Sequence, residues 1–327
     1  MRCVVTGSSG HLGEALVRSL RGRGDAVVGI DRRPSPFTTV VGSITDPELI
    51  RDAMHGADVV LHPATLHKPH VATHPRQAFV DTNVTGTLTL LEAAAEAGVQ
   101  ALVFTSTTSV FGRALTPAPG EPAVWVTEDT VPVPRNIYGA TKLAAEHVIE
   151  EVHHNERLPV VILRTSRFFP EPDDRPEIRR AFADDNLKAN ELLHRRVDIA
   201  DVVEAHLLAA ERAPALGFGR YVISATTPFE VGDLAELTRD AASVVARRFP
   251  EQPELYALSG WVPPASIDRV YANSRAREEL GWTPRYGFAQ VLESLRTTRD
   301  WRSPLTHAIG MKGYHDGMFQ TGLYPVD

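Results

Sequence analysis

The sequence contains a single cysteine, Cys3, which lies in the apolar run CVV. An intramolecular disulfide is therefore excluded, and a reducing compartment fits best. Within that run, Cys3 is better explained as a buried small side chain than as a reactive thiol. No apolar run approaches the length of a membrane span, and the N-terminal MRCVVTG lacks the basic and apolar regions of a signal peptide. We therefore expect a cytoplasmic protein with no membrane partner.

Basic residues are also in short supply. Lys and Arg number 34 against 41 Asp and Glu, which gives a formal net charge of -7 at pH 7. This charge argues against nucleic acid or an anionic membrane as a partner. The segment LHPATLHKPHVATHP holds histidines 62, 67, 70 and 74 but has no cysteine or carboxylate pattern beside them. We therefore predict no metal site and interpret these histidines as loop or substrate contacts, with His67 as the substrate candidate.

The first half of the chain does have a regular alternation of apolar runs and amphipathic stretches. Strands are predicted at 2–7, 26–31, 58–64, 101–106 and 158–164, with helical patterns between them. This alternation predicts an α/β fold with a Rossmann-type, doubly wound parallel sheet. The predicted strands are continuously apolar, as expected when helices cover both faces of the sheet.

The pattern changes after residue 166, where FFPEPDDRPEIRRAFADDN is rich in proline and charge. We predict two parts, a Rossmann domain and a smaller substrate-binding lobe over the carboxyl edge of its sheet. The Rossmann domain is predicted over 1–166, with later segments near 197–224 and 262–273 returning to it. The lobe and C-terminal tail are predicted over 167–196, 225–261 and 274–327. The tail from residue 307 has glycines, aromatics and no helical period, so we expect an extended strap packed on the body or on a partner subunit.

The segment TGSSGHLG, residues 6–13, joins the first predicted strand to the first helix. Gly7 allows a tight turn, Gly10 lets the backbone approach a pyrophosphate, and Gly13 allows close packing of the helix, whose N-terminus attracts phosphate. Asp31, at the end of the second strand, is placed to accept a hydrogen bond from an adenosine ribose. Its carboxylate would repel the extra phosphate of NADP, so NAD is the predicted cofactor. Arg32 and the next arginine could bind that phosphate, which leaves NADP as the alternative.

A candidate catalytic pair lies in PRNIYGATKLAAEHV, residues 134–148, where Tyr138 and Lys142 share one face of a predicted helix. A phenol with a pKa of about 10 is a poor base at neutral pH. An ammonium about 4 Å away would lower that pKa by roughly three units, whereas burial would raise it. Thr107 directly follows the predicted strand 101–106, at the sheet edge where ligands bind, and could hold a substrate oxygen beside Tyr138. For any single hydroxyl in that cluster, however, local hydrogen bonding is the better explanation.

Together these motifs resemble the extended short-chain dehydrogenase/reductase family, the NAD-dependent epimerase/dehydratase type that includes UDP-galactose 4-epimerase. The resemblance extends to LHPAT, NVTGT, FTSTTSVFG, YGATK, VILR and REELGWTPRYGF, and so covers most of the chain. It implies an enzyme with Thr107, Tyr138 and Lys142 as catalytic residues. It also implies a larger set of cofactor contacts: Gly7, Ser9, Gly10, His11, Leu12, Gly13, Asp31, Arg32, Ser43, Ile44, Pro63, Ala64, Thr65, Asn83, Thr105, Tyr138, Lys142 and Thr165.

Three departures from the family pattern concern the substrate. Sugar dehydratases of the family carry an Asp-Glu pair where this chain has Thr108 and Ser109, so we expect no dehydration and take Thr108 as a substrate contact. Arg167 stands near a position where sugar-nucleotide enzymes have asparagine; it could bind a diphosphate or carboxylate, or equally form a structural ion pair. The segment between FFPEPDD and HRRVDIADVVEAH is shorter than in nucleotide-sugar epimerases, which would leave a nucleotide less well covered.

We expect an NAD-dependent enzyme that oxidises or epimerises a secondary alcohol of a sugar or nucleotide-sugar, with a 4-epimerase-like reaction first. Tyr138 would take the hydroxyl proton as hydride passes to the nicotinamide. One alternative is an NAD(P)-dependent dehydrogenase or ketoreductase acting on a sugar acid or natural-product carbonyl; another is a non-catalytic dinucleotide-sensing protein. Family members are commonly dimers through helices like those at 91–97 and 143–148, so we expect a homodimer, although internal packing explains their alanines equally well.

Overall fold

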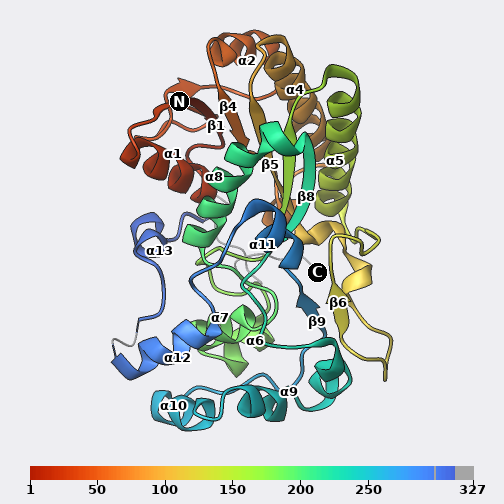
Figure 1. The fold of residues 1–327 in the computed structure, drawn as a ribbon, viewed down its shortest axis with the longest axis vertical. Helices are drawn as coiled ribbons and strands as arrows, with labels where there is room; N and C mark the ends of the chain where they lie inside the picture. The colour runs from red at the N-terminus through yellow and green to blue at the C-terminus, as the bar shows by residue number, and fades with distance from the viewer. Residues whose placement is uncertain (298–299, 314–327) are drawn as a thin grey trace.

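The computed structural model describes residues 1–297 and 300–313 of the 327-residue chain. A seven-stranded parallel sheet fills its upper half in Figure 1, with strand order β3-β2-β1-β4-β5-β7-β8. The strands are β1 (Arg2–Thr6), β2 (Ala26–Asp31), β3 (Val40–Val41), β4 (Val59–His62), β5 (Ala101–Thr107), β7 (Val160–Thr165) and β8 (Phe218–Ile223). The predicted Rossmann-type parallel sheet is confirmed.

Helices cover both faces of this sheet. One face carries α1 (His11–Gly22) and α8 (Ile199–Leu216), and the other carries α2 (Pro47–Met54), α4 (Gly86–Glu96) and α5 (Ile137–Glu156). Successive strand residues point to opposite faces. In β5, for example, Val103 packs in the core beneath α1 and α8, while Leu102 and Phe104 pack in the core beneath the other three helices. This two-sided burial is why the strands are continuously apolar.

The order of the strands reverses at the centre of the sheet. The chain moves outward from β1 to β2 and β3, then crosses back to place β4 on the other side of β1. In open parallel sheets the crevice at such a reversal, beyond the carboxyl ends of the strands, is where ligands bind. The loop at residues 6–13 leaves β1 at this point. The fold therefore places the predicted dinucleotide loop at the expected ligand crevice.

A smaller lobe lies below the carboxyl edge of the sheet in Figure 1. It contains the two-stranded parallel sheet of β6 (Val124–Val126) and β9 (Arg269–Tyr271). Its helices are α6 (Pro176–Ala181), α7 (Asp184–Leu192), α9 (Leu234–Arg248), α10 (Gln252–Ser259) and α12 (Phe288–Thr297). A separate apolar cluster that includes Phe229, Leu237 and Tyr256 supports it. The lobe thus has its own core, which lets it form one wall of a cleft against the sheet.

Several segments lie elsewhere than the sequence suggested. Residues 262–273 contribute β9, which pairs with β6 and not with the central sheet. Helix α11 (Ser274–Leu280) and Trp282, placed with the lobe by the sequence analysis, pack in the main core beside α8. The remaining helices are α3 (Arg76–Val80) and α13 (Pro304–Ile309). Residues 307–309 of the predicted strap therefore end a helix, 310–313 follow it, and 314–327 lie outside the described residues. Within the described ranges, no helix combines the length and apolar character needed to cross a bilayer.

Candidate active site

A cavity of about 1620 Å³ runs along the carboxyl edge of the sheet, between the sheet and the lobe. One end of the cavity is formed by the loop at residues 6–13 and the ends of β2 and β3; the other end is formed by charged residues of the lobe. It brings together most of the predicted site residues: Gly7, Ser9, Gly10, His11, Leu12, Gly13, Asp31, Arg32, Ser43, Ile44, Pro63, Ala64, Thr65, His67, Thr105, Thr107, Thr108, Tyr138, Thr165 and Arg167. Two predicted residues, Asn83 and Lys142, are buried and do not line it.

The loop at residues 6–13 has a shape that only glycine permits at two positions. Gly7 has a φ of +63°, and a Cβ there would lie 2.9 Å from the Cα of Ala64. A Cβ on Gly13 would lie 1.9 Å from the carbonyl oxygen of Gly7, so the helix could not pack against the turn. The helix α1 begins at His11, and its N-cap, Gly10, has no side chain to cap the first N–H groups. These donors suit a phosphate anion.

Asp31 is held at the end of β2 beside this loop. Its carboxylate accepts hydrogen bonds from the backbone N–H of Ser9 at 3.0 Å and of Arg33 at 2.9 Å. The glycine cradle, the uncapped helix start and this carboxylate therefore fit a dinucleotide with its pyrophosphate at α1 and its adenosine ribose near Asp31. Arg32 and Arg33 also line the cavity at this end.

The segment after β4 (residues 63–66) and the end of β5 line the cofactor end of the cavity, and we call them the cofactor wall. Asn83 supports this wall from behind. Its Oδ1 accepts hydrogen bonds from Thr65 Oγ1 (2.9 Å) and Leu66 N (2.8 Å). Its Nδ2 donates to the carbonyl of Leu66 (2.9 Å) and to Thr141 Oγ1 (3.0 Å). The oxygen and the nitrogen of the side-chain amide are therefore both hydrogen bonded within the protein. Asn83 fixes the segment after β4 against α5, and the structure places it behind the cavity wall and not at its surface.

His62 was grouped by sequence with three loop histidines, but the structure separates it from them. It is the last residue of β4, fully buried, with Nδ1 2.8 Å from Thr6 Oγ1 and Nε2 3.1 Å from Thr87 Oγ1. The Thr87 hydroxyl donates to the carbonyl of Asn83, so it accepts from His62 Nε2–H. Burial, together with the positive charge of Lys142, lowers the pKa of His62 to about 3. His62 is thus a neutral structural link beneath the cofactor wall.

Tyr138 and Thr107 meet at the middle of the cavity. Thr107 ends β5 and Tyr138 lies in the first turn of α5, and both side chains line the cavity. Burial raises the pKa of the Tyr138 phenol to about 12, although the nearby Thr107 side chain lowers it. The Thr107 oxygen also accepts from the backbone N–H of Ser109 at 3.1 Å, so local hydrogen bonding at the strand end is present as well.

Lys142 does not lower the tyrosine pKa as the sequence argument expected. Its ammonium lies 3.7 Å from the centre of the Phe104 ring, behind the cavity wall. Burial lowers the pKa of Lys142 to about 7, although the nearby Glu146 carboxylate raises it. At neutral pH the lysine therefore carries only part of its charge, and burial dominates the pKa of both catalytic candidates.

Sequence reasoning missed Glu146, which fixes the catalytic helix. It is fully buried one turn after Lys142 and accepts hydrogen bonds from Ser106 Oγ at 2.5 Å and from Arg164 Nη2 at 2.7 Å. Ser106 precedes Thr107 in β5 and Arg164 lies in β7, so one carboxylate ties α5 to both strands. The available signal was its four-residue spacing from Lys142, which places both residues on one helical face.

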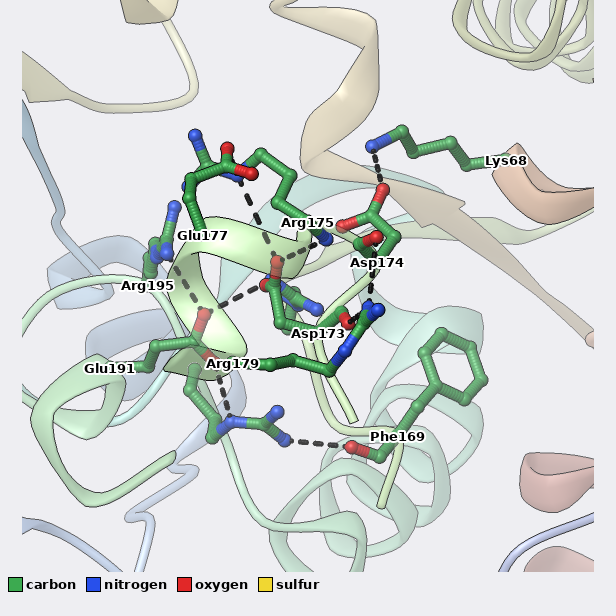
Figure 2. Close-up of polar contacts among 11 residues, drawn as sticks. Lys68, Phe169, Asp173, Asp174, Arg175, Glu177, Arg179, Glu191 and Arg195 are labelled. Atoms are coloured by element: carbon green, nitrogen blue, oxygen red, sulfur yellow. Dashed lines mark hydrogen bonds and ion pairs between the residues drawn. The ribbon is translucent and has the colours of Figure 1, made fainter. Parts of the chain in front are cut away.

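The lobe side of the cavity is held by ion pairs. Arg167, which the sequence left open as a ligand or a structural ion pair, donates from Nη1 to Asp173 Oδ2 at 2.7 Å and to Glu191 Oε1 at 3.1 Å. Glu191 also pairs with Arg195 at 3.0 Å and Arg196 at 2.9 Å. Figure 2 shows the Glu191 and Asp173 carboxylates among these guanidinium groups. Burial would raise the pKa of Glu191, but the three arginines hold it well below its usual range.

The loop after β7 also contacts the loop after β4 across the mouth of the cavity. Lys68 Nζ lies 2.8 Å from Asp174 Oδ2, and Figure 2 shows this side chain reaching over to the lobe. The His67 ring stacks on Phe169 at 5.5 Å between ring centres and lies 6.4 Å from the Tyr138 ring. His67 therefore lies close to Tyr138, the predicted acid/base residue. Over residues 1–297 and 300–313, no three His, Cys, Asp or Glu side chains gather in an arrangement that could hold a metal ion.

Comparison with known proteins gives a consistent result. A UDP-glucose 4-epimerase of Streptomyces lividans is 28% identical, with 96% of this chain and 98% of the relative covered. A 4-hydroxy-2-methyl-3-oxo-4-farnesyl-3,4-dihydroquinoline-1-oxide ketoreductase of Stigmatella aurantiaca is 30% identical, with coverages of 90% and 96%. The structure of MoeE5 in complex with UDP-glucose and NAD is 25% identical, with a TM-score of 0.61 and coverages of 92% and 98%.

The profile of the NAD dependent epimerase/dehydratase family matches residues 3–224, which span the whole central sheet and the catalytic helix. The sequence motifs, the parallel sheet and the relatives all indicate this same family. By name, the two relatives are an epimerase and a ketoreductase, and the MoeE5 structure contains NAD. This chain belongs to the NAD-dependent epimerase/dehydratase family, and it is an enzyme of the extended short-chain dehydrogenase/reductase type.

Proposed function

We propose that this enzyme oxidises a secondary alcohol of a sugar or nucleotide-sugar and acts as a 4-epimerase. The observation that carries the proposal is that Thr107 and Tyr138 line one continuous cavity together with the glycine cradle. On one side of this pair lies the glycine cradle at α1, and on the other lies the charged wall of the lobe. A substrate hydroxyl beside the two side chains would face a dinucleotide in the cradle.

The chain's own residues supply the proton transfer. Thr107 holds the substrate oxygen, and deprotonated Tyr138 takes its proton as general base. Lys142 lies one turn further along α5 and stays in the proposed catalytic set through the family resemblance, although its ammonium is buried over the Phe104 ring. When bound, the nicotinamide cofactor supplies the hydride acceptor. In an epimerase cycle the ketone would turn over in the site, the same hydride would return to the other face of the carbonyl carbon, and Tyr138 would return the proton to the oxygen, which gives the alcohol of opposite configuration.

The lobe side of the cavity favours a substrate with an anionic group. Its lining includes more cations than carboxylates: Lys68, Arg135, Arg167, Arg175, Arg195 and Arg269 against Asp173, Asp174 and Asp268. Arginine forks suit both the diphosphate of a nucleotide-sugar and the carboxylate of a sugar acid. The name of the Streptomyces lividans relative and the UDP-glucose in the MoeE5 complex support the nucleotide-sugar.

A dehydrogenase or ketoreductase is the second candidate function. Arg167 is engaged by Asp173 and Glu191, so a diphosphate would have to compete with two carboxylates for this guanidinium. The relative from Stigmatella aurantiaca, a ketoreductase by name, supports the same alternative. Incubation with NAD and either UDP-glucose or a free sugar acid separates the two candidates. Interconversion without accumulation of NADH supports epimerisation, whereas net NADH production supports a dehydrogenase.

The finer features of the proposal concern the cofactor, assembly and location. We propose NAD over NADP because the Asp31 carboxylate is held beside the cradle, with Arg32 and Arg33 as the features that favour NADP. A homodimer through α4 and α5 and a cytoplasmic location also belong to the proposal. Titration of both dinucleotides, together with light scattering, tests the first two of these points.

Substitution of Tyr138 by phenylalanine tests the assignment of the general base. Tyr138→Phe removes the proton acceptor, so turnover should fall by roughly 100-fold to 10,000-fold, the usual range for general acid–base catalysis. NAD binding, measured by calorimetry, should remain. Tyr286→Phe, a change outside the cavity, is the matched control and should keep full activity. Activity near the wild-type level in Tyr138→Phe would remove this residue from the mechanism.

A further inference from the structure

Glu171 joins three segments that are far apart in the sequence. It lies in the loop after β7, and its Oε1 accepts hydrogen bonds from the backbone N–H of Lys312 at 3.0 Å and of Gly313 at 3.2 Å. The same oxygen lies 2.7 Å from Nε2 of His11. Glu171 is buried, with 6% of its surface exposed. One carboxylate oxygen therefore connects the loop after β7, the start of α1 and the segment that follows α13.

The connection lies over the dinucleotide cradle. His11 is the first residue of α1 and directly follows Gly10, so it marks the helix end that attracts phosphate. Lys312 also reaches from the C-terminal segment to Glu14 in the first turn of the same helix. His11, Glu171, Lys312 and Gly313 all line the cavity. The segment 310–313 is thus fastened across the end of the cavity where the pyrophosphate fits.

The same contacts neutralise the carboxylates at this end of the cavity. Burial would raise the pKa of Glu171, but the hydrogen bond and charge of His11 and the N–H of Lys312 hold it below its ordinary value. The carboxylate is therefore ionised close to a site that has to accept a phosphate. Its Oε1 contacts His11 Nε2 and accepts from two backbone N–H groups, and the charge of Glu14 is offset by Lys312 and Arg18. The segment 310–313 in this position covers the cradle, and its contacts satisfy the carboxylates of Glu171 and Glu14.

We propose that Glu171 is a clasp that holds the segment 310–313 over the dinucleotide site and makes exchange of the cofactor slow. This inference rests on the proposed function, because it requires that a dinucleotide occupies the cradle. It also deepens that function. An epimerase reuses its cofactor in every cycle and gains from holding it, whereas a dehydrogenase has to release it after each turnover. A slow exchange therefore favours epimerisation as the reaction of this site.

The test measures the kinetics of cofactor exchange and not activity. The full-length protein is loaded with NADH, and release is followed by nicotinamide fluorescence after mixing with excess NAD; binding is followed by mixing with NADH directly. Glu171→Ala removes the shared acceptor, so release should become about tenfold faster, the effect of losing a charged hydrogen bond. Association should become faster as well, because the clasp opposes passage in both directions, and Kd should change less than either rate.

Two further variants make the result specific. Lys312→Ala removes only the contact with Glu14 and should accelerate release less than Glu171→Ala. Glu204 lies on α8 and forms an exposed ion pair with Arg285. Glu204→Ala removes this pair and should leave the rates of NADH release and association unchanged. Thermal unfolding of each variant shows whether it is folded, and Lys312→Ala alone decides the question if Glu171→Ala does not fold.

Contrary outcomes have distinct meanings. Release at the wild-type rate in the folded variants overturns the clasp and leaves the proposed function in place. Faster release with unchanged association also overturns it, because Glu171 would then be an ordinary contact with the cofactor and not a barrier to its passage. If the wild-type protein binds neither NADH nor NADPH, the proposed function fails and this inference fails with it.

Discussion

The two ends of the cavity are held together by different kinds of interaction. Behind the cavity at the cofactor end, below the clasp at Glu171, neutral hydrogen bonds fix the wall: His62 between Thr6 and Thr87, and the Asn83 amide around Leu66. At the lobe end, charged groups do the same work, with Glu191 at the centre of a set of arginines. A neutral, fully paired network is rigid and indifferent to the charge of its ligand, whereas an ionic one can exchange partners with a charged ligand.

This difference matches what each end has to recognise. The cradle at α1 fits the pyrophosphate that NAD and NADP share, so a fixed wall would be sufficient there. At the other end, Arg167 lines the cavity while paired with Asp173 and Glu191. An anionic substrate can take the place of one carboxylate without leaving the guanidinium unpaired. The lobe end is therefore where specificity can change without disturbing the cofactor.

The largest effect is expected from breaking the ionic end at its centre. Glu191→Gln keeps the shape of the side chain but removes the charge that three arginines share. Removing one partner from a buried ionic network costs about 3–5 kcal/mol of stability. Urea unfolding at neutral pH measures this loss. Glu211→Gln, at an exposed pair with Arg23, should change stability by less than about 0.5 kcal/mol. A small loss in Glu191→Gln would show that the arginines find other partners.

The sequence could predict the cofactor end and not the ionic one, for a physical reason. The glycine loop, Asp31 and the Tyr138–Lys142 pair are defined by spacing within one strand, turn or helix, so local periodicity is enough to find them. Glu171 and Glu191 acquire their roles only when distant segments meet. Neither glutamate belongs to a local motif, although both are buried in the fold.

Two local interpretations were wrong because they ignored tertiary surroundings. The expected effect of Lys142 on Tyr138 assumed an ammonium close to the phenol, but the fold places that ammonium over the Phe104 ring. His62 was interpreted with His67 as a loop or substrate contact, whereas it ends β4, within the predicted strand 58–64, and is fully buried. In both cases burial determined the pKa, and burial cannot be read from a spacing of residues.

Acid should distinguish the neutral end from the ionic end. His206 Nε2 lies 2.7 Å from the Thr105 hydroxyl of the cofactor wall, and burial lowers the pKa of this histidine to about 4. The unfolded histidine titrates near pH 6.5, so the folded pKa is the depressed one. Its contribution to stability is complete above about pH 6.5 and is lost as the pH falls towards 4, with a slope of about 1.4 kcal/mol per pH unit.

Unfolding by urea at several pH values measures this slope. His206→Gln should reduce the slope between about pH 6.5 and pH 4 by the equivalent of about one proton. The control is His154→Gln, because the side chain of His154 is exposed. This variant should leave the slope unchanged. Burial raises the pKa of Glu191, but the effect of the three arginines is larger and lowers it. The ionic end should therefore lose stability only at a lower pH, where Glu191 becomes protonated. An unchanged slope in His206→Gln would mean that this histidine is already protonated in the folded protein.

The smallest effect is expected at the mouth of the cavity, where Lys68 and Asp174 connect the two sides. The Lys68 side chain is 44% exposed, so Asp174→Asn should cost less than about 1 kcal/mol of stability. It should instead lower KM for an anionic substrate by a few-fold at low salt, since the unpaired ammonium attracts the anion, and this gain should fade as salt is added. Initial rates at two salt concentrations measure this change in KM.

The rate of NADH release from Asp174→Asn should stay at the wild-type value, because this ion pair lies at the lobe end and the clasp at the cofactor end. If Asp174→Asn accelerates NADH release as much as Glu171→Ala does, the two ends open together, and the independence inferred from their different interactions is wrong.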